Sequence, residues 1–301
     1  MNSKLDSIDA ILLFVVVPAI VLASLLEAWV LSRRTRYDWR ASGISVMDLV
    51  LRILINLTVP LALSTPVTQW AQGHKLTTLH LDTWQTVLLL FIGQEFCYYW
   101  FHRAAHRVRW FWCNHAVHHS PNDLNLTAAL RIGLFGKLTG TFIFFAPLVW
   151  LGFEPRLVAQ TLTLNLLYQF WIHATWIPKL GWMEYVFNTP SAHRVHHASN
   201  PQYLDANYGG VLIVFDRLFG TYVAERDDIP IRYGLVKPQR SYNPLRVEFD
   251  EWVSLVRDMI RAPSLKDALA HVVMPPAWRP PREALRPARS SPNPSVAVKP
   301  D

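Results

Sequence analysis

Histidines fall into three tight groups in this 301-residue chain, and their spacing is the feature best suited to chemistry. The groups read HRAAH, HAVHH and HRVHH. Their members are His102, His106, His115, His118, His119, His193, His196 and His197. Residues three or four apart share one face of a helix, so each group predicts a ready-made set of nitrogen ligands.

Clustered imidazoles need a metal, because unliganded rings repel each other when protonated and cost desolvation free energy when buried and neutral. Eight nitrogens exceed what one tetrahedral or octahedral ion uses. They suit two ions, each with an open position for O2. We therefore expect a dinuclear centre. Lone histidines are ordinarily satisfied or exposed, which is our interpretation of His74, His80 and His271.

Three polar residues near the groups are candidates for orienting the ligand imidazoles. Glu95 lies seven residues before His102, on the same helical stripe. It either accepts a hydrogen bond from a ligand imidazole or pairs with an arginine or a solvated cavity, and the sequence leaves both open. Asp205 and Asn207, just beyond the third group, are similar candidates.

The composition indicates that membrane helices position these groups. The chain is 51% hydrophobic and only 17% charged, which is too apolar for a typical soluble protein. The formal net charge of +7 fits basic residues in short cytoplasmic loops and not nucleic-acid binding. The two cysteines, Cys97 and Cys113, predict neither a disulfide framework nor an iron–sulfur cluster.

Five apolar runs are candidate spans, at residues 11–31, 49–63, 84–101, 138–153 and 157–176. The first is long enough for the ~30 Å hydrocarbon layer, and its basic residues follow it, which indicates a retained helix and not a cleaved signal peptide. The second carries Arg52, which Asp48 can pair, and it either crosses or is partly buried. The turn-like segment 154–156 makes the last two a helical hairpin.

Basic residues give the expected orientation. Arg33 and Arg34 follow the first run, and Arg103, Arg107 and Arg109 follow the third, so both ends are expected in the cytoplasm. An even number of spans separates the histidine groups, which places all of them there. His173, near the cytoplasmic end of the fifth run, is a candidate ninth ligand. The expected fold is all-α: a polytopic membrane helical bundle with a cytoplasmic helical cap holding a histidine-rich dimetal site.

Two features follow the histidine groups. Apolar residues from Phe249 to Ile260 recur at three- and four-residue spacing and predict an amphipathic helix, for which packing on the cap is favoured over lying on the membrane surface. From Pro275 the chain is rich in Pro, Arg and Ser and is predicted to be disordered.

The histidine boxes resemble those of the fatty acid hydroxylase and sterol desaturase superfamily. Residues 98–103, 188–190, 203–210 and 215–222 further resemble its alkylglycerol monooxygenase-like branch. The resemblance covers roughly residues 84–222. It implies that the eight grouped histidines hold a non-haem di-iron centre that uses O2 to hydroxylate or desaturate an acyl, alkyl or sterol chain, although isolated protein could carry zinc.

The apolar runs, the resemblance and the composition of the tail together divide the chain into four expected segments. They are N-terminal membrane helices (1–80), a fatty acid hydroxylase-like catalytic domain (81–224), a cytoplasmic helical segment (225–274) and the tail (275–301). We expect an integral protein, of a bacterial inner membrane, with the metal site on the cytoplasmic side.

Two other kinds of protein are less compatible with the residues. A zinc-dependent membrane hydrolase needs a general base, but HRAAH lacks the glutamate of HExxH. A non-enzymatic metal-binding membrane protein would line a path through the bilayer with histidines, whereas these gather at one face.

An oxygenase also needs electrons. Two cysteines cannot hold an iron–sulfur cluster, and no GxGxxG motif is present to bind a flavin or nicotinamide. We therefore expect a separate ferredoxin-like donor, which docks at exposed basic residues such as Arg107 and Arg109.

Overall fold

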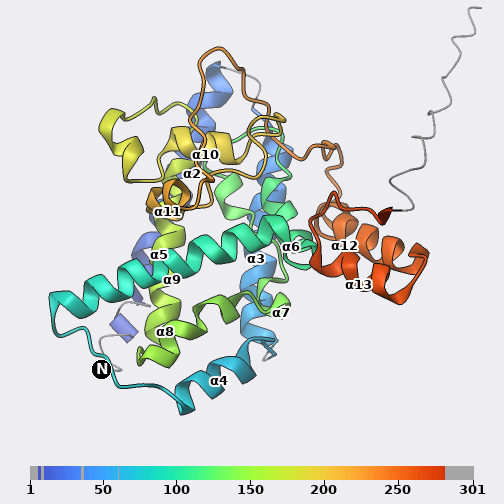
Figure 1. Ribbon diagram of the computed structural model, residues 1–301. Coiled ribbons are helices and arrows are strands. Elements are labelled where there is room, and N and C mark those ends of the chain that lie inside the picture. Colours follow the sequence, from blue (N-terminus) through green and yellow to red (C-terminus); the bar gives the residue numbers. More distant parts are fainter. Residues whose placement is uncertain (1–5, 8–9, 35–36, 60, 282–301) are drawn as a thin grey trace, which may run out of the picture.

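A computed structural model describes residues 6–7, 10–34, 37–59 and 61–281. This part of the chain is helical, with two isolated β-bridges, and the expected all-α class is confirmed (Figure 1). The α-helices are α2 (Val17–Arg34), α3 (Trp39–Thr58), α4 (Thr65–Gly73), α5 (Trp84–Arg107), α6 (Arg109–His119), α7 (Gly136–Thr139), α8 (Ala146–Leu151), α9 (Pro155–Ile172), α10 (Pro190–His196), α11 (Val214–Leu218), α12 (Pro244–Arg261) and α13 (Leu265–Val273). A π-helical turn, η1 (Leu12–Val16), precedes α2, and three 3-10 turns are η2 (Ala128–Leu130), η3 (Thr141–Phe145) and η4 (Gly181–Tyr185).

Two helices in the described ranges are long and apolar enough to cross a membrane. They are Phe14–Arg34, which includes α2, and α3. Both present large apolar side chains outward, such as Leu22 and Leu57. The second helix starts ten residues before the apolar run at Leu49, because Asp38 caps it: its carboxylate accepts a hydrogen bond from the Ala41 amide at 3.0 Å.

The other expected spans differ in outcome. The third run lies in α5, which continues through the first histidine group, and the fifth forms α9. The fourth run, 138–153, does not form one helix and is divided among α7, η3 and α8. Gly140 ends α7 in the left-handed region at φ 82°, and Pro147 is the second residue of α8, where its missing N–H costs nothing. The predicted hairpin therefore lacks a continuous first limb.

The predicted amphipathic helix is α12, which lies with α13 at the side of the body, next to α6 (Figure 1). It packs through Val247 against Ile44 and Val117, and through Trp252, whose ring centroid is 5.1 Å from that of Trp110. Ordinary packing thus accounts for one face of this helix.

The tail is ordered for longer than expected. Residues 275–281 are described, with Pro280 buried and the Trp278 ring 5.0 Å from that of His271. The predicted disorder is therefore wrong up to residue 281, because a tryptophan in a Pro-rich segment supplies enough apolar surface to anchor it. Residues 282–301 lie outside the described part of the chain.

Two buried carboxylates join α3 to α12. Asp48, besides lying 3.8 Å from Arg52 as anticipated, accepts hydrogen bonds from the amides of Ile132 and Gly133, both at 3.1 Å. Glu248 accepts one from Leu134 at 3.3 Å. Burial, together with the neighbouring Asp48, raises the pKa of Glu248 to about 8.

Alkaline pH should weaken this joint. Because the pKa of Glu248 is higher in the folded chain than in the unfolded one, its stabilising contribution is complete below about pH 4.5 and is lost as pH rises through about 8. The Glu248→Gln side chain cannot ionise. Between pH 6 and 9 the unfolding free energy of this variant should therefore fall by on the order of 1–2 kcal/mol less than that of the wild type. Thermal unfolding in detergent at both pH values measures it, with Asp250→Asn as the exposed control. Equal pH dependence in wild type and Glu248→Gln would contradict this assignment.

Candidate metal centre

Nine histidines from four segments meet in one region of the interior. They come from α5, α6, the residue after α9, and α10 with its C-cap. Their nitrogens form two groups, and within each the candidate ligand atoms lie within 4.8 Å of one another. The first group is His102, His106, His115, His119 and His196, and the second is His118, His173, His193 and His197. All nine candidates are thus brought together, whereas His74, His80 and His271 belong to neither group.

The two HxxHH boxes do not each form one ligand set. His118 and His119 are neighbours in sequence yet belong to different groups, and so do His196 and His197. Consecutive side chains on a helix point about 100° apart, so adjacent histidines face two different centres. Our expectation that each box forms a single set is therefore corrected. Only the pairs four residues apart stay together.

The two groups of histidines are in direct contact. The rings of His119 in the first group and His197 in the second stack with their centroids 4.4 Å apart, and the centroids of His196 and His193 are 5.4 Å apart. The two sets of nitrogens are thus separated only by imidazole rings.

Backbone carbonyls orient four of the nine rings. In each, Nδ1 lies within hydrogen-bonding distance of a carbonyl oxygen. The pairs are His102 with Tyr208 (2.9 Å), His118 with Arg131 (2.7 Å), His173 with Gln169 (2.7 Å) and His196 with Ala206 (3.0 Å). A carbonyl can only accept, so Nδ1 carries the proton and Nε2 keeps a free lone pair. This is the tautomer in which a histidine binds a metal through Nε2.

Hydrogen bonds among the rings cannot satisfy all of these nitrogens. The His115 Nε2 lies 3.0–3.1 Å from Nε2 of His102, His106 and His119, but one N–H can serve only one of the three. The buried Nε2 of His196 has no hydrogen-bond partner among the described residues. Two nitrogens bound at about 2.1 Å to one ion, at right angles, lie about 3.0 Å apart. The donor set therefore fits a metal ion in each group.

Electrostatics favours neutral ligands. Burial lowers the pKa of His118 to about 4 and that of His196 to about 3, although the hydrogen bonds to Arg131 and Ala206 act in the opposite direction. Both rings are therefore uncharged at neutral pH, as metal ligation requires.

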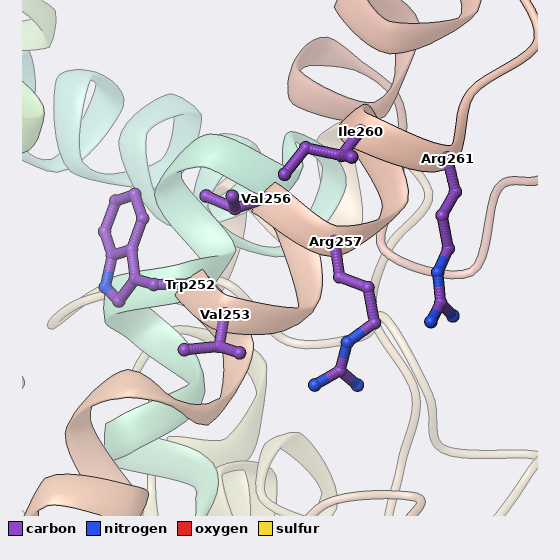
Figure 2. Close-up of a pocket in the computed structure, with 6 residues that line it drawn as sticks. All are labelled: Trp252, Val253, Val256, Arg257, Ile260 and Arg261. Carbon is purple, nitrogen blue, oxygen red and sulfur yellow. The ribbon is translucent and has the colours of Figure 1, made fainter.

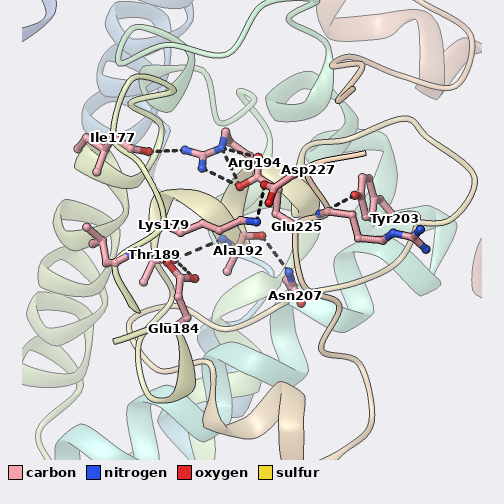
Figure 3. A network of polar contacts seen from close by, with 12 residues as sticks. Ile177, Lys179, Glu184, Thr189, Ala192, Arg194, Tyr203, Asn207, Glu225 and Asp227 are labelled. Carbon is pink, nitrogen blue, oxygen red and sulfur yellow. Dashed lines mark hydrogen bonds and ion pairs between the residues drawn. The ribbon is translucent and has the colours of Figure 1, made fainter. Parts of the chain in front are cut away.

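The three candidate orienting residues lie at different places. Asp205 contacts an imidazole: its Oδ1 is 3.8 Å from Nδ1 of His106, and its Oδ2 accepts a hydrogen bond from Arg107 at 2.7 Å. Asn207 instead donates to the carbonyl of Ala192, next to His193, and so positions the backbone of α10 (Figure 3).

The hydrogen-bond partners of Glu95 are ones that neither interpretation named. The buried carboxylate accepts hydrogen bonds from the amides of Val211 and Leu212, both at 2.8 Å, and from the side chain of Asn165. It thus fixes the loop that follows Tyr208. An acid at this depth is used here to hold irregular backbone whose amides have no helical partner.

Asp216 is a supporting residue of the site that was not predicted from the sequence. It is fully buried and accepts hydrogen bonds at 2.7 Å from the amides of Tyr208 and Gly209 and from the Thr221 hydroxyl. The Tyr208 peptide is the one whose carbonyl orients His102. The sequence gives one sign of this role, an acid among apolar residues in segment 215–222. By composition alone, such an acid is indistinguishable from one in a surface turn.

A second support also escaped notice. Arg194, between two histidines of α10, makes three hydrogen bonds from its guanidinium to Glu225 and one to the carbonyl of Ile177 at 2.7 Å. Figure 3 shows this network linking α10 to the segments before and after it. A bidentate pair of this kind fixes orientation as well as position.

Removing the Asp216 carboxylate should loosen the first group. Asp216→Ala leaves two buried amides without acceptors and frees the peptide that orients His102. We expect a 10- to 100-fold loss of metal affinity, as for other residues that orient metal ligands. Competition with a chelator measures it. Asp227→Ala, at an exposed ion pair with Lys179, is the matched control and should leave affinity unchanged. Equal affinities in the two variants would refute the role of Asp216.

These features define a class: an all-helical protein with membrane-capable helices and two adjacent histidine clusters able to hold metal ions. Residues 87–221 match the family model described as fatty acid hydroxylase. This part of the chain is therefore similar to the fatty acid hydroxylase family, which confirms the resemblance seen in its histidine boxes.

Curated relatives extend this result. The chain is 39% identical over 213 residues to alkylglycerol monooxygenase of Xenopus tropicalis, covering 71% of the chain and 47% of the relative. It is 36% identical over 269 residues to the Homo sapiens protein of that name, covering 89% and 59%. Ornithine lipid hydroxylase OlsE of Rhizobium tropici is 32% identical over 177 residues, covering 56% and 51%.

The chain thus spans about half the length of these relatives. They come from animals as well as a bacterium, which does not support our expected restriction to a bacterial inner membrane. No solved structure matches the chain.

Proposed function

We propose that this chain is a membrane oxygenase that hydroxylates, or desaturates, the hydrocarbon chain of a lipid with O2 and two iron ions. The observation that carries the proposal is the pair of adjacent histidine groups in a fatty acid hydroxylase domain. The three relatives reported above are two monooxygenases and one hydroxylase, and their names refer to two lipid classes, which favours hydroxylation. No glutamate follows His102 as a hydrolytic base, so a zinc hydrolase is disfavoured.

The residues of the chain would hold the metal ions and shield the site from bulk water. The nine histidines would hold the two ions, which when bound supply the power to activate O2 for attack on a C–H bond. The carbonyls of Tyr208, Arg131, Gln169 and Ala206 keep the ligating nitrogens deprotonated and aimed. Burial keeps bulk water from the site, which favours reaction with an apolar chain.

One helix connects the proposed lipid phase to the site. The first part of α5 presents Trp84, Leu88 and Ile92 outward along a shallow apolar groove, and the end of the same helix carries His102 and His106. At 1.5 Å per residue, Ile92 and His102 lie about 15 Å apart along the helix axis, less than the length of a long acyl chain. A chain lying beside α5 could thus reach from the lipid phase toward the centre.

The basic end of the two candidate spans supports a cytoplasmic site. Glu27 of α2 accepts a hydrogen bond from the Leu126 amide at 2.6 Å, and Ser42 of α3 contacts Thr127 at 2.9 Å. Both contacts lie soon after the second histidine box and close to Arg33 and Arg34. The positive-inside rule would therefore place this end, and the site, in the cytoplasm.

Mass spectrometry of lipids tests the proposal. A host that expresses the chain should contain lipids heavier by one oxygen, or lighter by two hydrogens for desaturation, which are missing from a host with the His196→Ala variant. Iron content of the purified chain is measured in parallel. An unchanged lipid extract despite iron-loaded protein and an electron supply would contradict the proposed activity.

A further inference from the structure

The outer face of α12 is apolar and uncovered. Val253, Val256 and Ile260 are 51%, 52% and 80% exposed, and with Trp252 they line a groove. Figure 2 shows these side chains along the helix, with Arg257 and Arg261 extending from the same stretch. The packing on α6 and α3 therefore accounts for only one side of this amphipathic helix.

The neighbouring helix α13 adds a second uncovered stripe. Leu265, Leu269 and Val273 recur every four residues and are 77%, 56% and 60% exposed. Exposed apolar stripes on two packed helices indicate an interaction site in a folded protein.

Charges on α12 are sorted by face. Three of its four acids contact other segments: Asp258 pairs with Arg109 at 2.6 Å, Glu248 accepts from Leu134 and Asp250 accepts from Gln239. In contrast, Arg257 and Arg261 have no recorded ion pair or hydrogen bond to any described residue, and they border the apolar groove. The rim of the groove is therefore positive.

The amino end of the same helix contacts a candidate span. Val247 and Glu248 of α12 contact α3 at Ile44 and Asp48. Directly beyond Asp48, α3 carries the exposed apolar residues Val50, Leu54 and Leu57, which are 49%, 49% and 79% exposed. Exposed apolar side chains of α3 thus continue directly beyond its contact with α12.

We propose that α12 and α13 lie on the membrane surface, with their apolar stripes at the boundary of headgroups and acyl chains and with Arg257 and Arg261 bound to anionic phospholipid headgroups. An apolar face bordered by basic residues is the pattern of helices that lie in this interface. The inference rests on the membrane embedding of α3, which the proposed function includes, and not on lipid oxidation.

This arrangement would also set the height of the metal centre. Helix α6, which carries three of the nine histidines, packs on α12 through Trp110 on Trp252 and through the Arg109–Asp258 pair. A surface-bound α12 would therefore hold α6 at a fixed depth beside the lipid.

Spin labels on single cysteines test the inference in the full chain, reconstituted in vesicles of phosphatidylcholine and phosphatidylserine. The native Cys97 and Cys113 are buried. Labels at Val256→Cys and Ile260→Cys should collide several-fold more with O2 than with a water-soluble nickel chelate. The reverse is expected at the control Asp250→Cys, and lipid contact is expected at Leu54→Cys on α3.

Several outcomes would overturn it. Nickel contact at Val256 and Ile260, with O2 contact at Leu54, would refute the surface helix and leave the embedding of α3 intact. Nickel contact at Leu54 as well would refute the embedding itself. Shielding of residues 256 and 260 from both reagents would show that a protein, and not lipid, covers this face.

The arginines have their own control. Charge reversal in Arg257→Glu/Arg261→Glu should raise nickel contact at Ile260 several-fold, whereas Arg257→Lys/Arg261→Lys should retain the wild-type value. Vesicles of phosphatidylcholine alone should mimic the reversal. Identical values in all these conditions would overturn the anionic-lipid contact.

Discussion

Replacing either His118 or His196 with alanine should abolish lipid oxidation, with a loss of at least about 100-fold, and should lower bound metal in both variants. Each change affects a different group: His196→Ala leaves four nitrogens in the first and His118→Ala leaves three in the second. Activity and metal analysis on the same purified samples measure the effect.

The matched control is His74→Ala, which removes an exposed histidine that belongs to neither group. This variant should keep wild-type activity and metal content. Membrane insertion of all three variants, checked by extraction, separates loss of ligation from loss of folding. Full activity with unchanged metal in His118→Ala or His196→Ala would refute the proposed ligand set.

Purified chain supplied with lipid, O2 and NAD(P)H should be inactive until a ferredoxin-like protein and its reductase are added. An oxygenase must be reduced in each turnover, and this chain has two buried cysteines and no GxGxxG motif with which to hold a redox group. Product formation with and without the donor measures the requirement. Turnover with NAD(P)H alone would reveal a cofactor site in this chain.

The structure changes where such a donor could dock. Arg109, one of the two arginines expected to attract it, is buried and bonded to Asp258, while Arg107 is exposed although paired with Asp205. Only exposed charge steers the association of the donor with the chain. The rate of donor-dependent turnover should therefore fall as salt is added, and Arg107→Glu should weaken this salt dependence. Arg109→Glu should instead destabilise the packing of α6 on α12.

The sequence was most informative where chemistry and helical spacing coincide. Histidines spaced three or four apart predicted one shared site, and His173 was found from its place at the end of an apolar run. The division of each HxxHH box between two groups was not predictable from spacing alone, since it depends on what lies on each side of α6 and α10.

Supports made by the backbone were the least visible. The carbonyls that orient His102 and His196 come from Tyr208 and Ala206, in a loop held by Asp216 and Glu95. No side-chain pattern marks a carbonyl acceptor. Similarly, hydropathy predicted a span over residues 138–153, but the backbone geometry of Gly140 and Pro147 broke it into short pieces.

The adjacent histidines of α6 and α10 also couple the two halves of the centre. His118 and His119 on one helix, and His196 and His197 on the other, contribute one ring to each group. An ion bound in one group would order both helices and so pre-form much of the other. Metal uptake should therefore be positively cooperative, with half-loaded chains scarce during a titration, because the second ion finds its ligands already immobilised.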